Sequence, residues 1–210
     1  MSRRALRLLG AAHGGLVHGR RVESLARALA PMMDPKWHLV DVGCGDGQLA
    51  ALIAERCEGL RVEGFEFAER PDTKIPVRVF DGCQLPLEDN SVDAVMLVDV
   101  LHHSDDARVL LREARRVARH AILLKDHRTA RPLAHITLRV MDWIGNKPHG
   151  VALPYNYWSE AQWRHVWDEL DLRVEAFETR LGLYPGPARL LFETGLHFVA
   201  RLGIGRGGAE

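Results

Sequence analysis

Short apolar runs alternate with helically spaced apolar positions along much of the chain. Apolar residues recur at helical spacing between residues 22 and 33, and a compact apolar run follows from Trp37 to Gly43. The alternation predicts strands over residues 37–42, 60–66, 77–80, 92–100 and 120–125, and helices over residues 22–33, 48–56 and 105–119. Because strands and helices alternate, we expect a parallel sheet that is covered by helices on both faces.

The pattern changes after residue 125. Residues 133–144 carry a one-sided apolar stripe that is typical of an amphipathic helix, and a polar, aromatic loop follows over residues 146–157. A further helix is predicted over residues 158–170. Two strands are predicted over residues 172–177 and 197–202, and we expect them to pair with each other. Residues 203–210 are expected to form a frayed tail.

Composition and charge restrict the class of protein. The 28 Lys and Arg balance the 28 Asp and Glu, and 47% of the residues are hydrophobic, which excludes a disordered chain and disfavours a nucleic-acid coat. No apolar run approaches the ~20 residues that a membrane-spanning helix needs. The 3 cysteines form no CxxC pair, so we expect no metal site, no disulfide framework and a reducing, cytoplasmic location.

The most informative motif is Asp41-Val-Gly-Cys-Gly-Asp-Gly, between a predicted strand and a predicted helix. Gly43, Gly45 and Gly47 remove side chains that would keep a ligand away from the backbone, and the start of the next helix offers free N–H groups. The spacing differs from the G-x-G-x-x-G fingerprint of dinucleotide sites, which disfavours NAD and FAD. The alternative is a tight turn that binds nothing.

Two carboxylates follow the next two predicted strands. Glu66 ends the second strand, where a carboxylate can accept hydrogen bonds from both ribose hydroxyls of a nucleoside. Asp81 follows the third strand and can accept from an adenine amino group. Phe67 and Leu85 are placed to pack on the faces of the base or to belong to the core. Each acid alone is equally compatible with a surface or turn position.

In this order the motifs resemble the class I S-adenosylmethionine-dependent methyltransferases of the ubiquinone and menaquinone methyltransferase group, methyltransferase type 11. The resemblance covers about residues 37–126. It rests on the segment from Asp41 to Gly47, on Gly64-Phe-Glu66, on Asp81 with residues 85–95, and on Asp99-Val-Leu-His-His. The family usually has Asp where this chain has Glu66, which changes the reach of the side chain and keeps its charge.

The resemblance implies a Rossmann-like three-layer α/β fold, with a mostly parallel seven-stranded sheet and an antiparallel C-terminal strand. It also implies S-adenosyl-L-methionine as the cofactor, with Glu66 at the ribose, Asp81 at the adenine and Asp99 near the methionine end. The full set of cofactor-binding residues is then Asp41, Gly43, Cys44, Gly45, Gly47, Glu66, Phe67, Asp81, Gly82 and Asp99.

We expect residues 1–210 to form a single domain. Residues 1–36 form its leading helical region and residues 37–126 its cofactor-binding half. Residues 127–202 form the acceptor-binding half.

Histidines supply the candidate general base. A sulfonium methyl donor is already activated, so the enzyme mainly orients the acceptor, and a base is needed only for a hydroxyl or an acidic carbon. His102, His103 and His127 lie at the ends of the fourth and fifth predicted strands, where open parallel sheets bind ligands. His103 and His127 are the preferred catalytic candidates, and Asp126 is placed to orient an imidazole or to be a surface acid. The alternative is that each histidine only caps the next helix or hydrogen-bonds a carbonyl.

The loop over residues 146–157 and its flanks are rich in aromatic and hydrogen-bonding side chains, which is typical of a pocket lining, although a docked connection is the alternative. We expect the preceding helix to act as a lid over a small, apolar or aromatic acceptor. The residues expected to bind the acceptor are Trp143, Asn146, His149, Tyr155 and Tyr157.

Three functions remain open at this stage. The first is methyl transfer to a small molecule. The second is a non-catalytic module that binds S-adenosylmethionine, and the third is methylation of RNA or protein, which the zero net charge disfavours. The sequence leaves the acceptor, the methylated atom and the oligomeric state undetermined.

Overall fold

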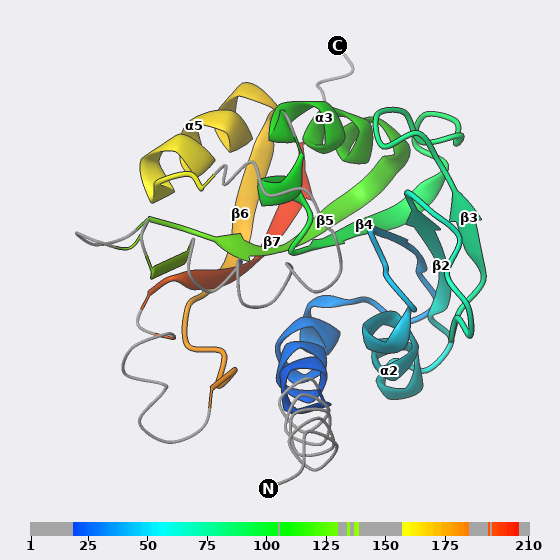
Figure 1. The fold of residues 1–210 in the computed structure, drawn as a ribbon. Helices are drawn as coiled ribbons and strands as arrows, with labels where there is room; N and C mark the ends of the chain where they lie inside the picture. Colours follow the sequence, from blue (N-terminus) through cyan, green and yellow to red (C-terminus); the bar gives the residue numbers. More distant parts are fainter. Residues whose placement is uncertain are drawn as a thin grey trace, which may run out of the picture.

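The computed structural model describes residues 19–104, 106–129, 134, 137–138, 157–184, 193 and 195–205. Its centre is a seven-stranded sheet with the strand order β3-β2-β1-β4-β5-β7-β6 (Figure 1). The first five strands run parallel, and β7 is antiparallel to both of its neighbours. This confirms the mixed sheet and the pairing of the last two strands. The strands are β1 (His38–Val42), β2 (Arg61–Glu66), β3 (Val77–Val79), β4 (Val92–Val98), β5 (Ala118–His127), β6 (Leu172–Glu178) and β7 (His197–Ile204).

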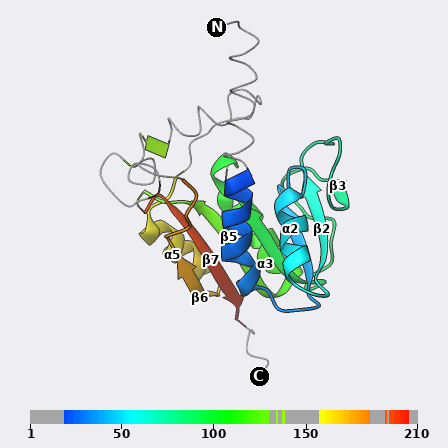
Figure 2. The ribbon, with the colours of Figure 1, turned by 90° about the horizontal axis from the view of Figure 1, so that it is seen from below.

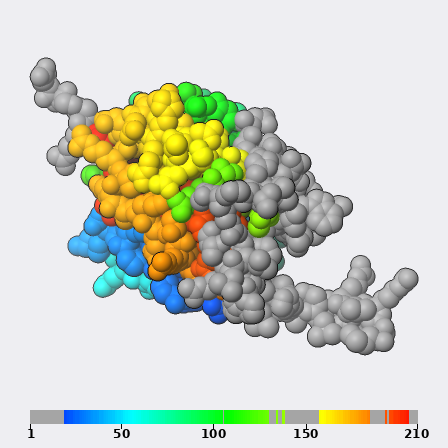
Figure 3. Space-filling model, turned by 90° about the vertical axis from the view of Figure 1, so that its left-hand side faces the viewer, coloured from blue at the N-terminus to red at the C-terminus, as the bar shows by residue number. Residues whose placement is uncertain are grey.

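Helices cover both faces of the sheet and make three layers. Residues 19–29 are helical and continue into the short 3-10 helix η1 (Ala30–Met32); they lie beside α2 (Gln48–Arg56) on one face (Figures 1 and 2). The other face carries α3 (Ala107–Val117) and α5 (Glu160–Glu169). Figure 3 shows α5, in yellow, beside the orange β6 segment on one surface of the molecule.

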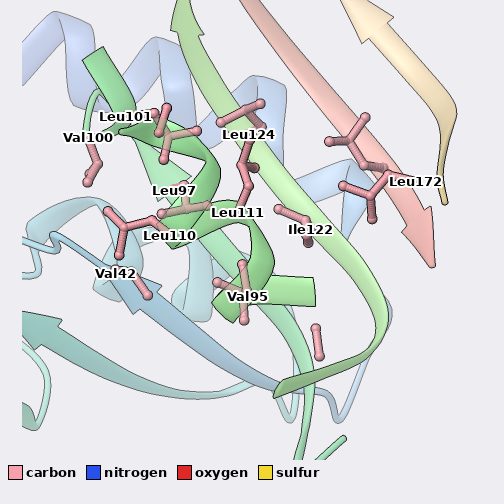
Figure 4. Close-up of a cluster of buried hydrophobic side chains, with 14 of the residues drawn as sticks. Val42, Val95, Leu97, Val100, Leu101, Leu110, Leu111, Ile122, Leu124 and Leu172 are labelled. Atoms are coloured by element: carbon pink, nitrogen blue, oxygen red, sulfur yellow. The ribbon is translucent and has the colours of Figure 1, made fainter. Parts of the chain in front are cut away.

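Alternation along the central strands separates two hydrophobic cores. Met96 points to the side of helix 19–29 and α2, whereas its neighbour Leu97 points to the side of α3 and α5. Leu123 and Ile122 alternate in the same way on β5. Figure 4 shows the second of these cores, where Leu97 and Ile122 lie among the leucines of α3. Each such side chain contributes about 1.5–3 kcal/mol by burial, so both faces hold the sheet in place.

Several boundaries differ from those expected from the sequence. Helix α3 ends at Val117, and β5 begins at Ala118 because this residue pairs with Val92 of β4. Strand β5 continues to His127 because β7 pairs with it as far as His197. Neighbouring strands therefore extend β5 beyond its apolar run, and pairing partners are invisible in a local pattern.

Two further segments were also predicted differently or are described only in part. Residues 203 and 204, expected in a tail, are the last two residues of β7 and pair with β6. Of the predicted helix over residues 133–144, the structure describes residues 134, 137 and 138, which are helical. Ala134 and Leu138 are buried with Leu196. Among the described residues, no helix is both long and apolar enough to cross a membrane.

Candidate functional site

The candidate site lies at the carboxyl ends of the parallel strands. The glycine loop follows β1, Phe67 follows β2, Asp99 follows β4, and His127 ends β5. In open α/β sheets this edge is where ligands bind, because the strand order reverses there and leaves a crevice. Here the reversal falls between β1 and β4.

The glycine loop turns sharply over the end of β1. Gly43, Gly45 and Gly47 all have positive φ, and the Gly43 N–H donates to the carbonyl of Phe65 at 2.7 Å. A Cβ on Gly43 would stand 2.5 Å from Cγ2 of Val100, so only glycine fits beneath the loop. A Cβ on Gly45 would meet no described atom within 4 Å, so this glycine leaves open space above the backbone.

Glu66 connects β2 to the glycine loop. Its side chain is buried, one carboxylate oxygen accepts the N–H of Gly45 at 2.7 Å, and the other accepts the N–H of Phe67 at 2.9 Å. The Nε of Arg70 lies 3.6 Å from Oε2 of Glu66. Each carboxylate oxygen keeps a second acceptor position, so Glu66 can bind further donors while it fixes the loop.

Asp41 lies beneath the same loop and is buried. Burial raises the pKa of its carboxyl to about 8, and the negative charge of Glu66 adds to the rise. This acid therefore holds its proton near neutral pH. A ligand ammonium group would favour its ionised form.

A first cavity of about 180 Å³ lies between the glycine loop, helix 19–29 and the end of β4. The predicted residues Asp41, Gly43, Cys44, Gly45 and Asp99 face it, together with Arg21. It therefore has acidic, basic and backbone groups on its walls, which suits the ammonium and carboxylate of an amino acid. Its lining residues are Arg21, Val22, Leu25, Asp41, Gly43, Cys44, Gly45, Asp46, Gln48, Leu49, Val98 and Asp99.

Asp99 is held between two cations. One carboxylate oxygen pairs with the guanidinium of Arg21 and the other with the Lys125 ammonium. Burial alone would raise the pKa of Asp99, but Arg21 and Lys125 outweigh it and hold this pKa well below its usual range. The residue has a φ of +58°, uncommon for a side chain other than glycine, and its N–H donates to the Lys125 carbonyl at 2.9 Å.

A second cavity of about 380 Å³ lies between the segments that follow β2, β3 and β4 and the first turns of α3. Phe67 is 49% exposed and forms one wall. Asp81 accepts the N–H groups of Cys83 and Gln84, both at 2.8 Å, which lowers the pKa of its carboxyl. Leu85 is buried in the core and is absent from the lining of this cavity. The lining residues are Phe67, Asp81, Gly82, Cys83, His103, Ser104, Asp106, Val109 and Leu110.

The two candidate histidines occupy different places. His103 lines the second cavity, with Asp81 and Phe67. His127 is buried, and its Nδ1 lies 3.8 Å from an oxygen of Asp99. Burial, with the charge of Lys125, lowers the pKa of His127 to about 4, so this imidazole is neutral at physiological pH.

A third histidine joins His127 in a buried cluster. The short 3-10 helix η2 (Leu101–His103) carries His102, whose Nδ1 lies 2.7 Å from an oxygen of Asp126 and 3.4 Å from Nδ1 of His127. The sequence predicted that Asp126 either orients an imidazole or is a surface acid, and in the structure the buried Asp126 contacts the imidazole of His102. Here the choice among neighbouring histidines depends on side-chain directions that the sequence does not give.

His197 is a member of the cluster that the sequence did not suggest. It pairs with His127 across β5 and β7, their ring centroids lie 4.7 Å apart, and its Nδ1 lies 3.4 Å from the Lys125 ammonium. Burial and Lys125 hold the pKa of His197 well below its usual value. The register of two antiparallel strands brings these residues together, so no local motif could have found them.

One of the five predicted acceptor-binding residues is described. Tyr157 is buried, and its ring centroid lies 6.0 Å from that of His102 and 5.9 Å from that of His127. The structure thus brings Tyr157 to the histidine cluster. The other four, Trp143, Asn146, His149 and Tyr155, lie outside the described residues.

Comparison with known protein families gives one matching family model, described as a methyltransferase domain, over residues 40–121. This segment contains the glycine loop, Glu66, Asp81 and Asp99. The match therefore covers the first four strands of the sheet and ends before His127 and His197.

Two characterised relatives match parts of the chain. Norajmaline N-methyltransferase of Rauvolfia serpentina is 28% identical over 120 residues, which is 50% of this chain and 41% of that protein. The 27-O-demethylrifamycin SV methyltransferase of Amycolatopsis mediterranei is 30% identical over 94 residues, which is 39% of this chain and 34% of that protein. The matches thus span less than half the length of these relatives.

A solved structure has the same fold over the whole chain. It is a chain of the complex between the Haloferax volcanii Trm112 methyltransferase activator and a methyltransferase, and it aligns over 100% of both chains with a TM-score of 0.71. The sequence identity is 16%, so the likeness concerns the arrangement of strands and helices.

Proposed function

We propose that the protein is a class I S-adenosylmethionine-dependent methyltransferase and that it transfers a methyl group from S-adenosylmethionine to a small molecule. The premise is the match of residues 40–121 to a family model described as a methyltransferase domain. The observation that carries the proposal is a pair of cavities near the carboxyl ends of the parallel strands, one beside the glycine loop and the other beside Phe67 and Asp81. One has the charges that suit an amino acid, and the other has an aromatic wall and an acid that suit a nucleobase.

The residues of this chain fit that donor. The open space above Gly45 provides room for the ligand against the backbone. Arg21 can pair with the methionine carboxylate, and Asp41, whose carboxyl group is buried beside the cavity, can take the ammonium. Glu66 can accept from the ribose hydroxyls, and Asp81 can accept from the adenine amino group.

The donor supplies a methyl group on a positively charged sulfur, which needs no further activation. The protein therefore acts by holding the acceptor in line and by excluding water. The apolar side chains of Leu25 and Val98 line the first cavity, which supports the exclusion of water from it. A general base is needed only where the acceptor atom must lose a proton, and we place it in the histidine group at the ends of β4 and β5, with His103 and His127 as the sequence-based candidates.

The acceptor is proposed to be small and apolar or aromatic. The names of the two characterised relatives both refer to methylation of small molecules. The rings of Tyr157, His102 and His127 supply an aromatic surface at the ends of β4 and β5. An aromatic or alicyclic acceptor would pack against such rings.

Calorimetric titration with S-adenosylhomocysteine tests the donor site. The variant Glu66→Gln should bind this ligand about ten- to a hundredfold more weakly, because a charged acceptor for the ribose hydroxyls is lost. Glu63→Gln is the matched control: Glu63 lies on the same strand and pairs with His38. Equal affinity of Glu66→Gln and the wild type would overturn the assignment of Glu66.

A further inference from the structure

The turn after β4 carries residues of both proposed halves of the donor site, and the buried residue His102 lies in this turn. It occupies the 3-10 turn after β4, with Asp99 of the first cavity three residues before it and His103 of the second cavity directly after it. Its ring centroid lies 4.0 Å from that of His103. A donor that places its methionine in one cavity and its base in the other brings its sulfur toward this turn.

Asp126 fixes the orientation of the His102 ring. The 2.7 Å contact joins the His102 Nδ1 to Oδ1 of Asp126, and the same oxygen accepts the backbone N–H of His127 at 2.7 Å. Both side chains are buried. Burial alone would raise the pKa of Asp126, but His102 outweighs it and the pKa is lowered, so the carboxylate is ionised. An ionised carboxylate at Nδ1 places the imidazole proton there and leaves Nε2 as the basic nitrogen.

The other two histidines are less suited to accept a proton. His127 lacks an equally short contact to a carboxylate, since its Nδ1 lies 3.4 Å from Asp126 and 3.8 Å from Asp99. The nearby Lys125 ammonium also opposes a positive charge on its ring. His103 faces the cavity assigned to the base of the donor. Of these three histidines, His102 is the one in which a place on the turn after β4 goes together with a short carboxylate contact.

A metal ion is the alternative use of the same cluster. Asp99, His102 and His127 offer ligand atoms within 4.8 Å of one another. However, Arg21 and Lys125 already pair with Asp99. The two carboxylates of the cluster, Asp99 and Asp126, are therefore balanced by two cations, and a divalent ion would add an uncompensated charge to a buried site.

We propose that His102 is the general base of the methyl transfer, that Asp126 is its positioning residue, and that the acceptor is a hydroxyl compound. This inference rests on the proposed function. Nε2 of His102 takes the hydroxyl proton, the oxygen bonds to the methyl carbon, and the carbon–sulfur bond breaks with its electron pair left on sulfur. The imidazolium then gives its proton to water. A neutral amine attacks through its own lone pair and has no need of such a base.

Nitrogen NMR of histidine-labelled protein, saturated with S-adenosylhomocysteine, tests the orientation without any acceptor. The wild type should show His102 with its proton on Nδ1, and Asp126→Asn should shift the tautomer toward Nε2–H. The titratable and charged groups around it are Asp99, His103, Lys125, Asp126, His127 and Tyr157. A His102 proton on Nε2 in the wild type would overturn the proposal, as would an unchanged tautomer in the variant.

Transfer of a carbon-13 methyl group tests the acceptor class. Wild-type protein is incubated with methyl-labelled S-adenosylmethionine and a small-molecule extract of the source cells, and the carbon shift of the product distinguishes methoxy from N-methyl and C-methyl groups. A methoxy product supports the proposal, and an N-methyl or C-methyl product overturns it. Loss of transfer on treatment with a chelator, restored by a divalent metal, would also overturn it.

Variants separate this inference from the proposed function. His102→Gln should lower the transfer rate about 10²- to 10⁴-fold and leave donor affinity unchanged. Asp126→Asn should lower the rate with little change in the donor KM, and the exposed control His165→Gln should behave as the wild type. Full activity of His102→Gln would overturn the base assignment. Absence of transfer by the wild type would contradict the proposed function, and the NMR result would then still decide the role of Asp126.

Discussion

The guanidinium of Arg21 pairs with the carboxylate of Asp99 and joins helix 19–29 to the end of β4 beside the first cavity. The two residues are 78 positions apart in the chain. Lys125 occupies the second oxygen of the same carboxylate. Asp99 is therefore committed to two cations, and we assign it a structural and electrostatic role in the donor site. It is unsuited to accept a proton, because both cations stabilise its ionised form.

Replacing Arg21 should weaken donor binding. Arg21→Gln removes the cation proposed to meet the methionine carboxylate, so the Kd for S-adenosylhomocysteine should rise about tenfold or more. Arg20→Gln is the matched control on the exposed side of the same helix. Titration calorimetry of both variants measures the effect, and equal affinities for the two would remove Arg21 from the site.

Asp41 should make stability depend on pH. Its pKa is raised to about 8, so the folded protein keeps a proton that the unfolded chain releases above about pH 4. The stabilisation from this proton is complete below the unfolded pKa and is lost as the pH rises through about 8. An asparagine does not titrate, so Asp41→Asn does not lose stability in this way. The free energy of unfolding of Asp41→Asn relative to that of the wild type should therefore increase between about pH 5 and pH 8. Urea unfolding of the two proteins without ligand measures it, and a constant difference would contradict the raised pKa.

Two glycines of the loop should respond differently to alanine. Gly43→Ala places a Cβ against Val100 at positive φ, so it should lower the free energy of unfolding by about 1–3 kcal/mol. Gly45→Ala also has positive φ but meets no described atom, so its loss should be smaller, about 1 kcal/mol. Its new methyl group should instead obstruct the donor.

Thermal unfolding and donor titration together check this pair of variants. A Gly45→Ala protein that binds S-adenosylhomocysteine as well as the wild type does would show that the ligand avoids this part of the loop.

Phe67 should serve the ligand more than the fold. Its ring is 49% exposed on the wall of the second cavity, so Phe67→Ala should leave the melting temperature nearly unchanged. The loss of a stacking surface should weaken donor binding by about 1–3 kcal/mol, the range seen for bases on aromatic side chains. Val79→Ala, at a residue 51% exposed on β3, is the control. A change in melting temperature without a change in affinity would place Phe67 in the structure alone.

Local sequence patterns predict the scaffold well and the acceptor side poorly. The apolar run before Gly43 and the helical pattern over residues 48–56 correspond to β1 and α2, because both elements are determined by nearby residues. The predicted ends of β5 were wrong, because β4 and β7 extend this strand by pairing with it.

The charged cluster around Asp99 also could not be predicted in full from local sequence patterns. Asp99 was predicted from its motif, whereas its partners Arg21 and Lys125 come from a helix and a strand far away in sequence. His197 reaches His127 only through the register of β5 and β7. Such contacts depend on tertiary packing, and a single sequence carries no local signal for them.

The central claim is methyl transfer to a small molecule through the donor site that contains Glu66. It is tested most directly by incubating the protein with radiolabelled S-adenosylmethionine and a whole extract of the source cells, and by measuring the label in the small-molecule, RNA and protein fractions. The predicted result is label in the small-molecule fraction with the wild type and with Glu63→Gln, and much less with Glu66→Gln. Label confined to RNA or protein, or no label above that of the extract alone, would contradict the claim.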